Sequence, residues 1–135
     1  MTARTLWQAR VLIWGALGAL ALSGADAQTA KVNTIEEVGR ALGACWIPPP
    51  LEKSRPGTQI TVLITFTRSG EVMGEPKFTY ITPGIPQEVR AAYQMSVADA
   101  ISRCVPLPFT PGLGNAVAGH PFAMRYDDNR GQKGI

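Results

Sequence analysis

The chain has 135 residues, of which 45% are hydrophobic and 17% are charged, and its 13 Lys and Arg against 10 Asp and Glu give a formal net charge of +3. This balance is typical of a globular domain and excludes a highly charged disordered chain or a collagen-like chain. The basic residues are scattered along the sequence rather than clustered. We therefore expect no nucleic-acid partner.

The N-terminus has the pattern of a Sec-type signal peptide. A basic segment precedes an uninterrupted apolar run over residues 11–22, and the small residues Ala25 and Ala27 follow as a cleavage site. The run is shorter than the roughly 20 residues that a helix needs to cross a bilayer. We therefore predict that residues 1–27 are removed and that the protein is periplasmic. An uncleaved segment that anchors the protein to the inner membrane is the alternative.

The predicted mature chain, residues 28–135, has 135 − 27 = 108 residues, the size of one domain with a modest core. Loss of Arg4, Arg10 and Asp26 lowers its formal charge from +3 to +2. We expect the ordered core at about residues 34–127, followed by a polar tail.

Cys45 and Cys104 are the only cysteines of the chain. In an exported domain an even pair is expected to form a disulfide, with two buried free thiols as the alternative. On the chain-entropy estimate, closing the loop between them stabilises the domain by about 4 kcal/mol. Cysteines paired in this way are not available as zinc ligands, so we expect no metal and no cofactor.

A first helix is expected to begin at Thr34, because Thr34 and Glu37 have the spacing of a capping box. Apolar residues follow at helical spacing, namely Ile35, Val38, Leu42 and Cys45. The three prolines at 48–50 prevent the helix from continuing. Cys45 thus stands at the end of a stripe that faces the core, where Trp46 is expected to cover the core beside the disulfide.

Two strands are expected next, joined by a hairpin turn at Gly70. In residues 58–67 the apolar side chains alternate with mostly polar ones, and they are Ile60, Val62, Ile64 and Phe66. The returning strand, residues 72–80, contains Gly74 and Pro76. Because proline cannot donate to a strand on both sides, we place this second strand at an edge of the sheet.

A second helix is expected from Pro86, with an apolar stripe that ends at the second cysteine and consists of Val89, Tyr93, Val97, Ala100, Ile101 and Cys104. Pro106 and Pro108 stop it, and a loop rich in Gly and Pro follows over residues 111–119. Residues 120–126 read as a last short strand, with Phe122, Met124 and Tyr126 pointing inward. The sequence from Asp127 onward is polar.

The predicted order is therefore helix, strand, strand, helix, strand. A right-handed crossover through the second helix places the third strand beside the first and antiparallel to it. The expected fold is an α+β two-layer sandwich with a three-stranded antiparallel sheet, strand order 2-1-3, and both helices on one face. The disulfide then joins the C-terminal ends of the two helices.

These motifs resemble the C-terminal domain of TolA and, at the level of the fold, that of TonB. The resemblance rests on Cys45-Trp46 with its prolines, the hairpin ITVLITFTRSGEV, the helix that ends in Arg103-Cys104 before Pro106, Pro108 and Phe109, and the closing strand HPFAMRY. It covers roughly residues 34–127. It implies a periplasmic protein-protein interaction domain whose sheet edge accepts an extended segment of a partner, with a role in cell-envelope integrity or outer-membrane transport. Members of that family carry an inner-membrane helix and a long linker, and we expect this chain to depart from them, because its hydrophobic segment looks cleavable and only a few residues separate it from the domain.

The third strand is the candidate binding edge, because Pro76 makes the other edge unsuitable. Its residues are Phe122, Ala123, Met124, Arg125 and Tyr126. An open edge is a template for β-augmentation by a periplasmic or outer-membrane protein, or by a second copy in a homodimer. The alternative is that the tail or the loop at 111–119 covers this edge.

We expect no enzymatic activity and no small-molecule substrate. His120 is the only histidine and has no sequence neighbours that would complete a catalytic triad or a metal site. Asp127 and Asp128 are two acids in a polar tail, where solvation is the usual state. A stand-alone secreted enzyme or enzyme inhibitor on the same fold is the alternative function.

Overall fold

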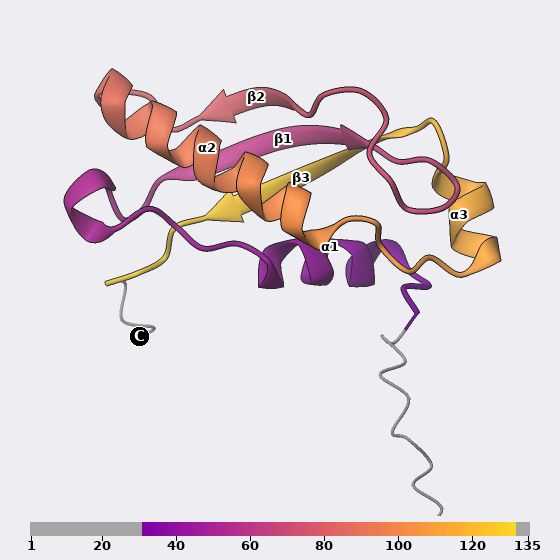
Figure 1. The fold of residues 1–135 in the computed structure, drawn as a ribbon. Coiled ribbons are helices and arrows are strands. Elements are labelled where there is room, and N and C mark those ends of the chain that lie inside the picture. Colours follow the sequence, from indigo (N-terminus) through magenta and orange to yellow (C-terminus); the bar gives the residue numbers. More distant parts are fainter. Residues whose placement is uncertain (1–30, 132–135) are drawn as a thin grey trace, which may run out of the picture.

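The computed structural model describes residues 31–131, so the predicted signal segment lies outside the described residues. Its elements follow the predicted order, and the sheet has the strand order β2-β1-β3 with both pairings antiparallel. The two long helices cover one face of the sheet (Figure 1). The disulfide between Cys45 and Cys104 is present, with 5.8 Å between the two Cα atoms. The predicted fold class is thus confirmed.

Helix α1 (Ile35–Ala44) begins where the capping residues place it. The Thr34 side chain accepts a hydrogen bond from the Glu37 backbone N–H at 3.2 Å. The Glu37 carboxylate accepts from the backbone N–H of Asn33 at 2.8 Å, one residue before the partner that a standard capping box uses. Val38 and Leu42 are buried against the sheet, as the helical spacing predicts, whereas Ile35 of the same predicted stripe is exposed in the first turn.

Strand β1 (Gln59–Thr65) is the centre of the sheet, and its core-facing side chains, Ile60, Val62 and Ile64, are fully buried. Strand β2 (Lys77–Ile81) is shorter than predicted, since residues 72–76 contribute only an isolated bridge between Phe66 and Val72. Gly74 has a positive φ of 68°, and proline follows at position 76, so this stretch cannot continue the ladder.

Helix α2 (Gln87–Cys104) begins one residue after the predicted Pro86, which is instead its N-cap. Tyr93, Val97 and Ile101 pack with the core residues of β1 in a single hydrophobic cluster. Helices α1 and α2 both lie on this face (Figure 1). Because side chains alternate along a strand, the opposite face of the sheet carries the mostly polar remainder of β1.

A third helix, α3 (Pro111–Val117), occupies the segment that was predicted to be a loop. Thr110 is its N-cap and accepts from the Leu113 N–H at 3.3 Å, while Pro111 fits the first turn. Leu113 is buried. A Cβ at Gly114 would overlap the backbone oxygen of Arg68, so α3 packs against the hairpin turn at one end of the sheet.

Candidate functional site

Strand β3 (Pro121–Asp127) lies at an edge of the sheet. It pairs with β1 in a regular antiparallel register from Gln59↔Asp127 to Thr65↔Pro121. Within residues 31–131 no strand pairs with its other side. This is the edge that the sequence identified as the candidate binding strand.

The direction of each backbone group along β3 follows from the ladder. The Asp128 N–H donates to the Thr58 oxygen at 2.9 Å, so the backbone of Asp128 faces β1. Since the direction alternates along an antiparallel strand, the backbone groups of Phe122, Met124 and Tyr126 also face β1. Of the five residues predicted for the edge, only Ala123 and Arg125 turn their backbone groups outward, together with Asp127 beyond them.

At both ends of this outward row, one backbone group is unavailable for hydrogen bonding to a partner. Pro121 has no N–H, so it offers only its carbonyl oxygen. The Asp127 carbonyl oxygen already accepts from the Asn129 N–H at 3.1 Å. The outward donors are therefore the N–H groups of Ala123, Arg125 and Asp127, and the outward acceptors are the oxygens of Pro121, Ala123 and Arg125.

Neither of the two segments that we considered as covers for this edge lies along it in the described part of the chain. The segment at 111–119 forms α3 and then rejoins the chain beside β1, where the Gly119 N–H donates to the Phe66 oxygen at 3.0 Å. Between residues 31 and 131, no backbone hydrogen bond from outside the sheet reaches Ala123 or Arg125.

The side chains of β3 divide between the two faces. Met124 and Tyr126 are buried under the helices, and the Tyr126 hydroxyl donates to the Leu42 oxygen at 3.4 Å. Burial raises the pKa of Tyr126 to about 12. On the open face, the Arg125 Nε atom lies 3.0 Å from Asp127 Oδ1 in an exposed ion pair.

The disulfide region is architectural. The Trp46 ring packs on Tyr126 with 5.3 Å between the ring centroids, and its Nε1 donates to Ser96 Oγ at 3.0 Å. The exposed guanidinium of Arg103 donates to the Cys45 carbonyl oxygen at 2.8 Å, which ties the two helix ends together a second time. Trp46 thus covers the core beside the disulfide, as predicted.

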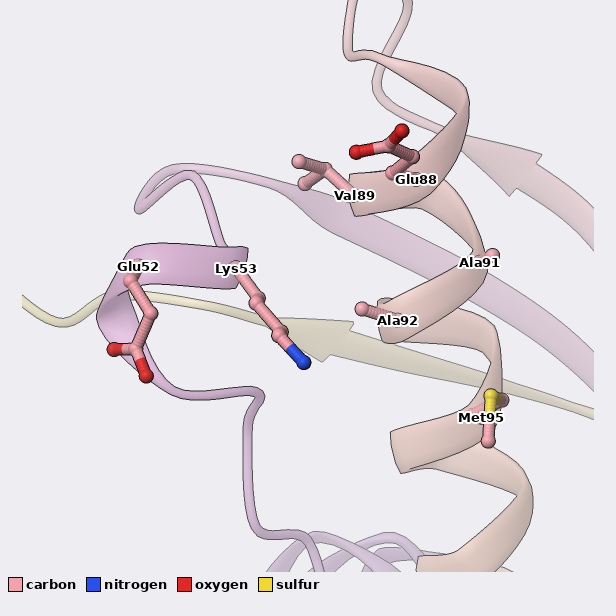
Figure 2. A pocket seen from close by; sticks show the side chains of 7 residues that line it. All are labelled: Glu52, Lys53, Glu88, Val89, Ala91, Ala92 and Met95. Carbon is pink, nitrogen blue, oxygen red and sulfur yellow. The ribbon is translucent and has the colours of Figure 1, made fainter.

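A cavity of about 340 Å³ lies between α2 and the 3-10 turn η1 (Leu51–Lys53). Figure 2 shows the Lys53 side chain extending into this space, opposite Ala92 and Met95 of α2. Ala92, Met95 and Lys53 also line a second cavity of about 390 Å³ beside the proline segment. The polar side chains that line the second cavity include Ser96 and Asp99, and Ser96 Oγ is already bonded to the Tyr93 oxygen at 2.7 Å.

Asp128 is the polar residue that sequence reasoning misjudged. It is 2% exposed rather than solvated, and the polar tail is therefore wrongly predicted at this position. Arg130 grips its carboxylate with Nη2–Oδ2 at 2.8 Å and Nε–Oδ1 at 2.9 Å, and the Tyr93 hydroxyl donates to Oδ2 at 2.5 Å. We call these three side chains the Asp128 latch.

The titration behaviour of the latch follows from these contacts. The hydrogen bonds from Arg130 hold the pKa of Asp128 below its usual value, against the opposing effect of burial. Burial, followed by the hydrogen bond to Asp128, raises the pKa of Tyr93. The latch fastens the chain after β3 to helix α2, and Tyr93 also accepts from the Arg55 N–H at 2.9 Å.

His120 is exposed at the start of β3, next to α3. Within residues 31–131 no group of three or more His, Cys, Asp or Glu side chains is arranged to hold a metal ion. The same described residues include no helix that is long and apolar enough to cross a membrane.

The chain was compared with known protein families, curated proteins and solved structures. No curated protein and no solved structure matches the chain significantly. The family described as "Uncharacterised conserved protein UCP034077" matches residues 28–130, which is most of the chain. The chain belongs to this family.

Proposed function

We propose that this protein is a non-catalytic periplasmic interaction module that binds an extended segment of another envelope protein at the outer edge of β3. The observation that carries the proposal is the outward row of backbone groups on Ala123 and Arg125, which have no partner within the described residues. Main-chain hydrogen bonds to such a row supply affinity in β-augmentation. The resemblance to the C-terminal domains of TolA and TonB supports a role in cell-envelope integrity or outer-membrane transport.

The periplasmic location is part of this proposal. The family match begins at residue 28, directly after the predicted cleavage position, so the signal-like segment stands outside the region that the family shares. A disulfide between Cys45 and Cys104 fits an oxidising compartment. Mass spectrometry of the exported protein tests the location, and a mass that includes residues 1–27 in the membrane fraction would favour the anchored alternative.

The binding edge is tested by substitutions that act on the outward groups alone. Ala123→Pro removes an outward N–H while leaving the bonds to β1 in place, and edge strands tolerate proline at such positions. Ala123→Ser keeps the N–H and is the matched control. Phe122→Pro and Met124→Pro are less suitable, because their N–H groups face β1 and their loss would damage the fold itself.

The assay is affinity capture from envelope extracts, with the captured proteins identified by mass spectrometry. We expect a protein that the wild type and Ala123→Ser retain and that Ala123→Pro loses. If all three proteins capture the same envelope proteins in equal amounts, the β3 edge is not the binding site.

A further inference from the structure

We infer that the β3 edge is self-complementary, and that a second copy of this chain pairs with it in an antiparallel register that places Met124 on a two-fold axis. The inference rests on the proposed function, since it uses the same open edge. The second copy and an extended segment of another protein then compete for the same backbone groups of β3.

The argument is a match between the free backbone groups. In this register Ala123 lies opposite Arg125 of the second copy, and each residue donates to and accepts from the other. The Asp127 N–H of each copy then reaches the Pro121 oxygen of the other. Pro121 has no N–H to offer, and Asp127 has an oxygen that already accepts from Asn129. The missing donor therefore faces the occupied acceptor, and every outward group of β3 obtains a partner.

Neighbouring registers lose part of this match. If Arg125 lies opposite Arg125 of the second copy, Ala123 lies opposite Asp127 of the second copy. The Asp127 oxygen already accepts from Asn129, so the Ala123 N–H has no acceptor. If Ala123 lies opposite Ala123 of the second copy, Arg125 lies opposite Pro121 of the second copy, which has no N–H to donate to the Arg125 oxygen. A group left without a partner in an interface costs free energy, so the register with Met124 on the axis is favoured.

The side chains are compatible with this arrangement. On the helix side Met124 lies opposite Met124 of the second copy and Phe122 lies opposite Tyr126, so no charged side chain enters the pairing on that face. On the open face Arg125 lies opposite Ala123 of the second copy. Each Arg125 keeps its own partner Asp127 at 3.0 Å, so the two arginines do not meet as uncompensated charges.

Helix α1 has a matching surface. A two-fold axis perpendicular to the sheet keeps both copies of α1 on the same face, on either side of the axis. Gly39 and Gly43 lie on the side of α1 that contacts Met124, where a Cβ would meet only the Met124 side chain, at 4.0 and 3.8 Å. Ile35 lies one turn before Gly39 and is 45% exposed. A second α1 across the axis would cover Ile35.

The test uses cysteine cross-linking of the purified protein with its native disulfide intact. Met124→Cys places one thiol of each copy on the axis, in a non-hydrogen-bonded pair with the Cα atoms about 4.5 Å apart, within disulfide reach. Arg125→Cys is the control, because it faces Ala123 of the second copy and its thiols lie beyond that reach. We expect a covalent dimer from Met124→Cys under mild oxidation and at least tenfold less from Arg125→Cys.

Sedimentation equilibrium of proteins without an introduced cysteine provides the second measurement. We expect a concentration-dependent dimer for the wild type and for Ala123→Ser, and a folded monomer for Ala123→Pro. A wild type that remains monomeric, or equal cross-linking of the two cysteine variants, would overturn the inference. If the wild type is monomeric and Ala123→Pro still loses an envelope protein, the proposed function stands and only the self-pairing falls. If Ala123→Pro changes neither property, both fall.

Discussion

Replacement of Asp128 by Asn tests whether the latch stabilises the fold. The substitution keeps the shape of the side chain and removes its charge. It weakens two bonds from the Arg130 guanidinium, at 2.8 and 2.9 Å, and one from the Tyr93 hydroxyl. Hydrogen bonds to a charged group contribute about 1.5–3 kcal/mol each. Because the Arg130 side chain is 31% exposed and regains water, we expect the free energy of unfolding to fall by about 2–3 kcal/mol in total.

The pH dependence gives the sharper test. The pKa of Asp128 is lowered in the folded protein relative to the value of 3.8 in the unfolded chain. A group of this kind contributes its full stability above the unfolded pKa and loses it as the pH falls through 3.8 toward the folded value. The wild type and Asp128→Asn should therefore differ most at neutral pH and converge as the pH falls below 3.8.

Urea unfolding at several pH values measures this difference. Asp127→Asn is the matched control, since Asp127 and its partner Arg125 are 47% and 58% exposed, and it should change the stability by less than about 0.5 kcal/mol. A difference between wild type and Asp128→Asn that stays constant with pH would refute the assigned role of the charge. A loss no larger than that of Asp127→Asn would refute the latch altogether.

Three further predictions concern stability and chemistry. Replacing Cys45 and Cys104 by Ala should lower the free energy of unfolding by about 4 kcal/mol, because their separation of 59 residues closes a long loop, and a loss below 1 kcal/mol in urea unfolding would contradict the chain-entropy account. Gly39→Ala should raise it by about 1 kcal/mol, since the added Cβ has room inside a helix, and calorimetry showing a lower midpoint would contradict this. His120→Ala should leave both the thermal midpoint and capture of envelope proteins unchanged, and a loss of capture would reopen the question of its role.

The fold was predictable because its signals are local and agree with one another. The alternation in β1 and the apolar stripes of both long helices each mark one buried face, and Pro76 marks an edge strand. Helix α3 was missed because Gly112 and Gly114 lower helix propensity. Its start was nevertheless signalled by Thr110 followed by proline, an N-cap residue followed by a first-turn residue.

The site was predictable only in part. An open edge at β3 follows from strand order, but the limits of that edge depend on Pro121 at one end and on the bond from Asn129 to Asp127 at the other. The burial of Asp128 gave no sequence signal, since apolar periodicity says nothing of a charged residue after a strand. The one available hint was Arg130, two residues on, with the opposite charge.

The Asp128 latch and the β3 edge share the turn that follows β3, and this turn limits which backbone groups of the edge can bind a partner. Arg130 holds Asp128 both through its guanidinium and through its backbone N–H, which donates to Oδ1 at 3.3 Å. The resulting turn places the Asn129 N–H on the Asp127 oxygen and so ends the edge. Asp128→Asn should loosen this turn and free that oxygen, which removes the reason for preferring Met124 over Arg125 on the axis. In the Asp128→Asn background, we therefore expect the cross-linking preference for Met124→Cys over Arg125→Cys to decrease, and an unchanged preference would show that the side chains rather than the backbone groups determine the register.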